Sequence, residues 1–197
     1  MNIGGFLGVI ALMFVLELPD KTMIATVVMS TKARPSSIVI GASSAFVVQM
    51  ALATAAGGVI TLLPTRARES VIALLFLGGA AYLLFVPESS EEREGQREAR
   101  AERAGTRRRE IVTAFGVIFV GEFGDLTQIQ AASLSARTHA PVEVFLASSI
   151  ALVGVSFLGA YGGRALQRLV PLRAVRLLGG VVFAVLGVAT AVTAVRG

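Results

Sequence analysis

The sequence predicts an all-α polytopic membrane protein with six transmembrane helices, arranged as two inverted three-helix repeats. Of the 197 residues, 54% are hydrophobic and only 16% are charged, whereas soluble domains carry about 25% charged residues. Several apolar stretches exceed the roughly 18 residues needed to cross a bilayer. Short acidic motifs also recur at a fixed distance in the two halves of the chain. These three observations indicate a duplicated helical membrane protein.

The first half contains three apolar segments, at residues 3–31, 36–63 and 71–86. A polar Glu-Leu-Pro-Asp-Lys run interrupts the first segment at Glu17, so we expect a broken helix there. Prolines stand at both ends of the second segment and after the third. Proline fits only the first turn of a helix, which makes these residues the expected helix boundaries.

The second half repeats this order, with apolar segments at residues 111–136, 142–163 and 175–195. Glu122 and Asp125 interrupt the first of these three segments, as the acidic run does in the first half. A proline precedes the second, and the third runs almost to the end of the sequence. We therefore expect the fourth span to be broken as well.

A charged linker at residues 88–110 joins the halves and holds seven arginines and seven glutamates. Acidic and basic residues often stand four apart in it, which is typical of a solvated, partly helical segment. The sequence therefore predicts a first three-helix repeat at residues 1–87, the linker, and a second repeat at residues 111–197.

The basic residues predict the orientation in the membrane. With six spans, 13 of the 18 basic residues fall in the first, third and fifth loops, and four fall on the other face. The positive-inside rule then places the linker in the cytoplasm and both termini outside. Arginine greatly outnumbers lysine, which favours a bacterial source, so the expected location is the bacterial inner (plasma) membrane.

An internal repeat relates the halves at an offset of 105 residues. The offset aligns these pairs: Glu17–Thr22 with Glu122–Thr127, Ser43–Ser44 with Ser148–Ser149, and Gly57–Gly58 with Gly162–Gly163. Because each half has an odd number of spans, the second half enters the membrane from the opposite side. Such inverted repeats bind their substrate near the midplane. The glycine and serine pairs are expected to allow close helix packing.

Four acidic residues lie deep inside apolar segments: Glu17, Asp20, Glu122 and Asp125. Burying a carboxylate at the bilayer centre costs a few kcal/mol on insertion scales. The spacing of three residues puts both acids of a pair on one helical face. Pro19 or Gly124 stands inside each pair and can free backbone carbonyls. The acids are therefore candidate ligands.

Other oxygen-bearing side chains surround the acids. Thr22, Thr127 and Gln128 follow the two motifs directly and add hydroxyl and amide oxygens. Gln49, in the middle of the second segment, is open between a packing role and a ligand role. Lys21 is expected to be a charge partner of the acids rather than a nucleophile.

This set of groups suits a hard divalent cation, because carboxylate, hydroxyl and carbonyl oxygens favour Mg²⁺, Ca²⁺ or Mn²⁺. The chain has no cysteine and one histidine, which disfavours a zinc or copper site. When the ion leaves, protons are the natural compensation, since neighbouring carboxylates in a low dielectric raise each other's pKa. The alternative is structural, with the acids pairing with Lys21 and nearby hydroxyls to lock the helices.

With its two motifs, Glu17–Thr22 and Glu122–Thr127, the sequence resembles the Gdt-type family of membrane cation/proton exchangers. That family carries Glu-x-Gly-Asp-[Lys/Arg]-[Ser/Thr] once in each three-helix half. The resemblance covers essentially the whole chain. It implies export of Mn²⁺ or Ca²⁺ from the cytosol in exchange for protons, with the motif acids as ligands and the threonines in support. Pro19 and Leu126 depart from the family pattern, which bears on ion selectivity and stoichiometry.

The resulting hypothesis is a secondary transporter that exchanges Mn²⁺ or Ca²⁺ for protons, with the ion as substrate and the lipid bilayer as surroundings. A proton-coupled exporter of a small organic cation or amino acid, and a non-transporting membrane scaffold, stay open as alternatives. We expect no prosthetic group, no nucleic-acid partner and no enzymatic activity, because neither a nucleophile–base set nor a phosphate loop is present. Homo-oligomerisation is left open.

Overall fold

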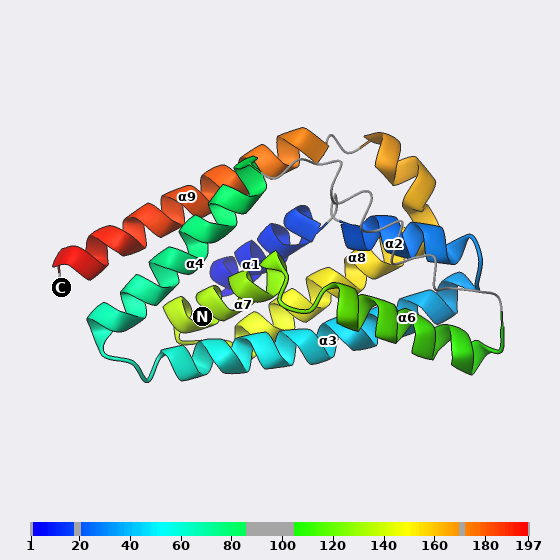
Figure 1. Ribbon diagram of the computed structural model, residues 1–197, viewed down its shortest axis with the longest axis horizontal. Helices are drawn as coiled ribbons and strands as arrows, with labels where there is room; N and C mark the ends of the chain where they lie inside the picture. Colours follow the sequence, from blue (N-terminus) through cyan, green and yellow to red (C-terminus); the bar gives the residue numbers. More distant parts are fainter. Residues whose placement is uncertain (1, 18–20, 86–104, 170–171, 197) are drawn as a thin grey trace.

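The computed structural model describes residues 2–17, 21–85, 105–169 and 172–196, and all regular secondary structure in these ranges is α-helical (Figure 1). The helices are α1 (Ile3–Glu17), α2 (Lys21–Ser30), α3 (Pro35–Ile60), α4 (Thr65–Phe85), α6 (Arg107–Gly121), α7 (Leu126–Thr138), α8 (Pro141–Leu169) and α9 (Leu172–Arg196). The predicted all-helical class is therefore confirmed for the described part of the chain.

Both predicted broken segments contain two helices. The first segment forms α1 and α2, and the predicted break at residues 18–20 lies outside the described residues. The fourth segment forms α6 and α7, with the interruption at the second acidic motif. The second, third, fifth and sixth segments correspond to the helices α3, α4, α8 and α9.

Local chemistry explains most of the helix ends. Pro35 and Pro141 occupy the first turns of α3 and α8, where a missing N–H group has no cost. His139 ends α7 in the left-handed region, with φ 52°. Thr106 caps α6 by accepting a hydrogen bond from the N–H group of Arg109 at 3.4 Å. Because of this cap, α6 begins inside the segment that the sequence predicted as linker.

Two of the described helices are both long and apolar enough to cross a membrane, at residues Pro35–Ile60 and Pro141–Gly162. Ile3–Glu17 and Gly180–Val195 are apolar but shorter. These findings cover only the residues that the structure describes. The six-span count stays a prediction.

The two long helices α3 and α8 contact each other and form the centre of the bundle. Each also packs on the broken segment of the other half, since α3 contacts α6 and α7 while α8 contacts α1 and α2. The third helices of the halves, α4 and α9, pack mainly on one another. Figure 1 shows that α3 and α8 run in opposite directions, as do the two broken segments.

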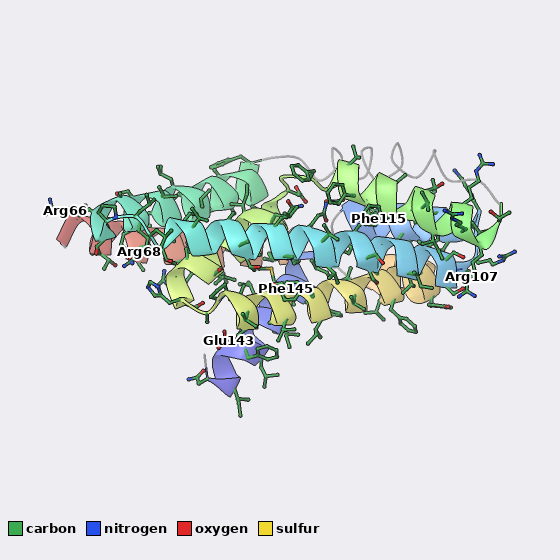
Figure 2. All side chains as sticks on the ribbon, turned by 90° about the horizontal axis from the view of Figure 1, so that it is seen from below. Arg66, Arg68, Arg107, Phe115, Glu143 and Phe145 are labelled. Carbon is green, nitrogen blue, oxygen red and sulfur yellow. The ribbon has the colours of Figure 1, made fainter. Side chains whose placement is uncertain are left out.

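The interior of the bundle is apolar and closely packed. Met13, Phe46, Met50 and Ile118 are each at most 1% exposed and belong to one continuous hydrophobic cluster. Long apolar side chains also cover the outside, as expected for a helix bundle in lipid. Charged side chains gather at the ends, with Arg66 and Arg68 at one end of the molecule and Arg107 at the other (Figure 2).

The glycine pairs pack less uniformly than the sequence predicted. An added Cβ at Gly57 of α3 would collide with the carbonyl oxygen of Ala132 in α7, so this helix contact requires glycine. At Gly58 and Gly162, no described atom lies within 4 Å of an added Cβ. Close packing is thus confirmed at Gly57, whereas none of the described atoms packs closely on its neighbour or on its repeat counterpart.

Candidate functional site

The break between α6 and α7 is a short turn formed by the second acidic motif. Glu122 caps the C-terminus of α6, and Asp125 stands at the N-cap of α7 in an extended conformation. Gly124 between them has φ +80°, a left-handed conformation that a side chain would strain. The glycine therefore lets the chain leave one helix and enter the next within four residues.

Gln128 bridges this break with both ends of its carboxamide. Its oxygen accepts a hydrogen bond from the N–H group of Gly124 at 3.1 Å, and its nitrogen donates to the carbonyl oxygen of Glu122. The N–H group of Asp125 also donates to that carbonyl oxygen, at 3.1 Å. Gln128, which the sequence suggested as a ligand, thus stabilises the backbone of the site. Its role as a ligand stays a prediction.

Gln49 of α3 supports the same break from the other half of the chain. Its amide nitrogen donates to the carbonyl oxygen of Phe119 at 3.0 Å and approaches that of Ile118 at 3.4 Å, both near the end of α6. Its amide oxygen is buried and has no hydrogen-bond partner among the described residues. The packing role that the sequence left open is therefore present, and the oxygen of Gln49 stays a candidate ligand.

The acids of the two motifs are buried where the structure describes them. Glu17 at the end of α1 is 0% exposed, Glu122 is 1% exposed, and Asp125 is partly buried. Asp20 lies outside the described residues. The described acids thus combine a high desolvation cost with positions at helix ends, which is typical of functional carboxylates in membranes.

The neighbouring side chains are described in part. Thr127, in the first turn of α7, is 5% exposed. Lys21 and Thr22 begin α2, and their side chains lie outside the described part of the structure. The predicted roles of Lys21 as a charge partner and of Thr22 as a ligand therefore stay predictions.

The helix ends at the break favour a cation near Glu122. The C-terminus of α6 carries the negative end of its helix dipole, and the carboxylate of Glu122 adds to that negative potential. The N-terminus of α7, where Asp125 stands, presents the opposite, positive potential. Asp125 makes no side-chain capping bond to α7. The break thus holds two acids at the facing ends of two helices.

Within the described ranges, no three histidine, cysteine, aspartate or glutamate side chains form a group that could hold a metal ion. Asp20, one of the four predicted acids, lies outside those ranges. The helix that ends at Glu17 does contact α7, which begins after Asp125. The convergence of all four acids in one chamber stays a prediction.

Sequence reasoning missed one buried polar residue next to the site. Gln130 of α7 is 0% exposed, and it follows the second motif by only three residues. The signal was present in the sequence, because Gln130 is a further amide inside an apolar segment. It lacks a counterpart in the first half, where the repeat places Ala25, and therefore did not stand out in the alignment of the halves.

A buried glutamate at the end of α1, and a second one at the helix break between α6 and α7, are features of the class of membrane ion transporters. Comparison with known families gives the particular family. The model of the family described as divalent cation/proton antiporter GDT1 matches residues 5–91 and 110–197. The chain belongs to this family of membrane transporters.

Relatives in rice are similar to the chain over most of its length. They are the GDT1-like protein 3 of Oryza sativa subsp. indica and that of subsp. japonica, each 24% identical over 192 residues. The alignments cover 88% of this chain and 68% of each rice protein. No solved structure matches the chain.

Proposed function

We propose that the protein exports Mn²⁺ or Ca²⁺ from the cytosol in exchange for protons. The observation that carries this proposal is the near-complete burial of Glu17 and Glu122, one in each half, at the ends of α1 and α6. Membership of a divalent cation/proton antiporter family supports the same exchange. Asp20 and Asp125 complete the proposed set of acidic ligands.

The ligand chemistry favours hard divalent cations over other substrates. The motifs supply carboxylates, the threonine hydroxyls of Thr22 and Thr127, and amide oxygens. Oxygen ligands of this kind bind Ca²⁺ and Mn²⁺, whereas the sequence has no cysteine for softer metals. In this proposal, the first turn of α7 contributes ligands next to the backbone carbonyls at the end of α6.

Protons are the proposed counter-ion because four carboxylates cannot remain together and charged once the metal ion has left. Mutual repulsion and desolvation favour protonation of some of them. Binding of the ion then releases these protons, and its departure takes them up again. The charge balance of the site therefore couples binding of the metal ion to release of protons.

The contacts between the halves support an inverted repeat with alternating access. Gln49 of α3 contacts Phe119 of α6, and the repeat-related positions are Gly154 of α8 and Phe14 of α1. An added Cβ at Gly154 would lie 3.3 Å from the ring of Phe14, so this second pair is also adjacent. Matching contacts in the two halves favour motion of one half against the other around a central site.

The proposed location is the inner membrane of a bacterium, with the linker in the cytoplasm and both termini outside. The distribution of basic residues supports this orientation. The separation of Arg107 from Arg66 and Arg68 at opposite ends of the molecule agrees with it (Figure 2). In this orientation the α6 end that carries Arg107 faces the cytosol.

Transport in proteoliposomes tests the proposed function. Mn²⁺ and Ca²⁺ should enter liposomes when an outward proton gradient is imposed, and internal pH should rise as they do. Mg²⁺ and amino acids should be transported more slowly. Uptake of amino acids alone would favour the organic-substrate alternative. Absence of uptake for every substrate by a folded protein would favour a scaffold.

Variants of the acids test which residues carry the exchange. Asp20→Asn, Glu122→Gln and Asp125→Asn should each lower Mn²⁺ or Ca²⁺ uptake by more than about tenfold, because each removes a charged ligand. Thermal unfolding in detergent should show that the variants remain folded. Glu69→Gln is the control, since Glu69 lies outside the apolar segments and pairs with Arg68 at 3.5 Å. Wild-type transport in all three acid variants would contradict the proposed site.

A further inference from the structure

Gln130 of α7 carries a fully buried amide group. Neither its amide nitrogen nor its amide oxygen has a hydrogen-bond partner in the part of the chain that the structure describes. Nearby polar side chains of α7 differ: Ser133 donates to the carbonyl oxygen of Ile129 at 2.7 Å, and Ser135 to that of Thr54 at 2.9 Å. A buried amide without partners is destabilising, so its presence requires a reason.

Apolar side chains lie on the α4 side of Gln130, and a glycine makes room there for the amide. An added Cβ at Gly79 of α4 would lie 2.5 Å from Nε2 of Gln130 and 2.8 Å from Cδ1 of Leu126. Phe183 of α9 lies on the same side, with its ring 6.1 Å from that of Phe76 in α4. A leucine or methionine would fill this space without an unpaired polar group. Packing alone therefore does not explain the amide.

The position of Gln130 relates it to the acidic site. It stands five residues after Asp125 and three after Thr127, and residues three apart are neighbours on a helix surface. Gln130 therefore lies on the same side of α7 as Thr127, about one turn further from the helix break. In the first half, the residue at the equivalent position is Ala25, which is 0% exposed. The halves share their acids, but only the second half adds this amide.

We propose that Gln130 is a further ligand whose amide oxygen binds the transported divalent cation between the acids at the helix break and the end of α7. This inference rests on the proposed function. Amide oxygens are ordinary ligands of Ca²⁺ and related hard cations. The side chain is neutral, so it holds the ion more weakly than a carboxylate does. Weak intermediate binding allows an ion to pass rather than remain trapped.

Replacement of the amide by an apolar group of similar size tests this role. Gln130→Leu and Gln130→Met should raise the KM for Mn²⁺ or Ca²⁺ by about tenfold, because an oxygen ligand is lost. The midpoint of thermal unfolding without metal should stay the same or rise, because an unpaired buried amide is removed. Gln130→Glu should have the opposite effect on binding, with a lower KM and a lower kcat, because a charged ligand releases the ion slowly.

Two adjacent glycines of α4 provide a matched pair of variants. Gly79→Ala introduces a methyl group that displaces the end of the Gln130 side chain, so it should raise KM in the same direction as Gln130→Leu. Gly78→Ala is the control, because no described atom lies within 4 Å of an added Cβ there. It should leave KM unchanged.

The outcomes separate this inference from the proposed function. If the wild type exchanges cations for protons and both apolar variants retain its KM, the role of Gln130 is overturned and the exchange stands. If the apolar variants unfold at a lower temperature in proportion to their loss of transport, a structural role replaces the proposed one. If the wild type neither transports Mn²⁺ or Ca²⁺ nor gains thermal stability from them, both proposals fail.

Discussion

Glu122 and Asp125 stand on the two sides of a helix break whose backbone is held by an amide side chain. In a membrane, a break leaves N–H and C=O groups that water cannot satisfy. Gln128 satisfies one of each, since it accepts from Gly124 and donates to the carbonyl group of Glu122. The geometry of the two acids therefore depends on a residue that follows Asp125 by less than one helical turn.

Gln128→Leu should lower the free energy of unfolding by about 1–3 kcal/mol, because the N–H group of Gly124 and the carbonyl group of Glu122 each lose a hydrogen-bond partner. Chemical or thermal unfolding in detergent measures this change. Gln130→Leu is a suitable comparison, since it removes a buried amide that makes no hydrogen bond to the described residues. Equal stability of the Gln128 variant and the wild type would show that the bridge contributes nothing.

At the residue scale, the sequence predicted which acids are buried but not which groups the buried amides bond to. The depth of Glu17 and Glu122 followed from their positions inside apolar segments, and both are buried. The contacts of Gln49 and Gln128 with backbone groups did not follow, because they depend on where α6 ends in space. Gln130 was missed because the repeat has no amide at the equivalent position.

At the scale of elements, α6 and α7 follow one another in the same direction as two parts of one segment (Figure 1). The interruption was predictable, since acids and a glycine stand inside an otherwise apolar stretch. The ends of the helices were less so: α6 begins at Arg107 and α9 at Leu172, before their apolar stretches. Charged residues can continue a helix beyond the membrane-like region, and composition alone does not reveal this.

The contact between α3 and α7 depends on one glycine. Gly57→Ala should destabilise the protein by about 1–3 kcal/mol, because the added methyl group meets the backbone of Ala132, which cannot rotate away. Gly58→Ala should have no comparable effect, since the space beside it is open among the described atoms. Unfolding midpoints of the two variants provide the comparison. A similar loss in both would point to helix propensity or lipid contact instead.

The junction of α3 and α6 contains a buried acid outside the apolar segments. Glu110 is 2% exposed, and the nearby side chain of Ser37 is the main cause that lowers its pKa. The backbone of Gly105 and the positive charge of Arg34 lower this pKa further, against the opposing effect of burial. A carboxylate whose pKa is lowered by folding stabilises the native state above its unfolded pKa, and this stabilisation is lost as the pH falls.

Glu110→Gln should therefore be less stable than the wild type at pH 7. The difference should shrink as the pH falls below about 4, where the wild-type carboxyl group becomes protonated and neutral. Thermal unfolding of both proteins across this pH range measures the difference. A gap that stays constant with pH would show that the charge of Glu110 is not its cause.

At the scale of the whole molecule, two groups of helices can be distinguished. The pair α4 and α9 packs mainly on itself, and the remaining helices surround α3 and α8. The order of the helices in each half was predictable from the repeated motif. The grouping was not, because the apolar faces of α4 and α9 do not indicate which helix they contact.

The absence of cysteine allows a direct test of orientation in the membrane. Arg107→Cys should react with a membrane-impermeant maleimide only after the cells are opened, because the proposed orientation places this end in the cytoplasm. Arg66→Cys, at the other end of the molecule, should react in intact cells (Figure 2). Labelling in the reverse order would overturn the proposed orientation while leaving the fold unchanged.

Each broken segment lies against the long second helix of the other half, and this arrangement has a consequence for the parts of the chain. The helices α1 and α2 pack against α8, while α6 and α7 pack against α3. Either half by itself would leave its acid-bearing helices uncovered. A protein made of one half would cover these helices only by pairing with a second copy that runs in the opposite direction. Such a protein would therefore need to form a homodimer whose two copies have opposite orientations.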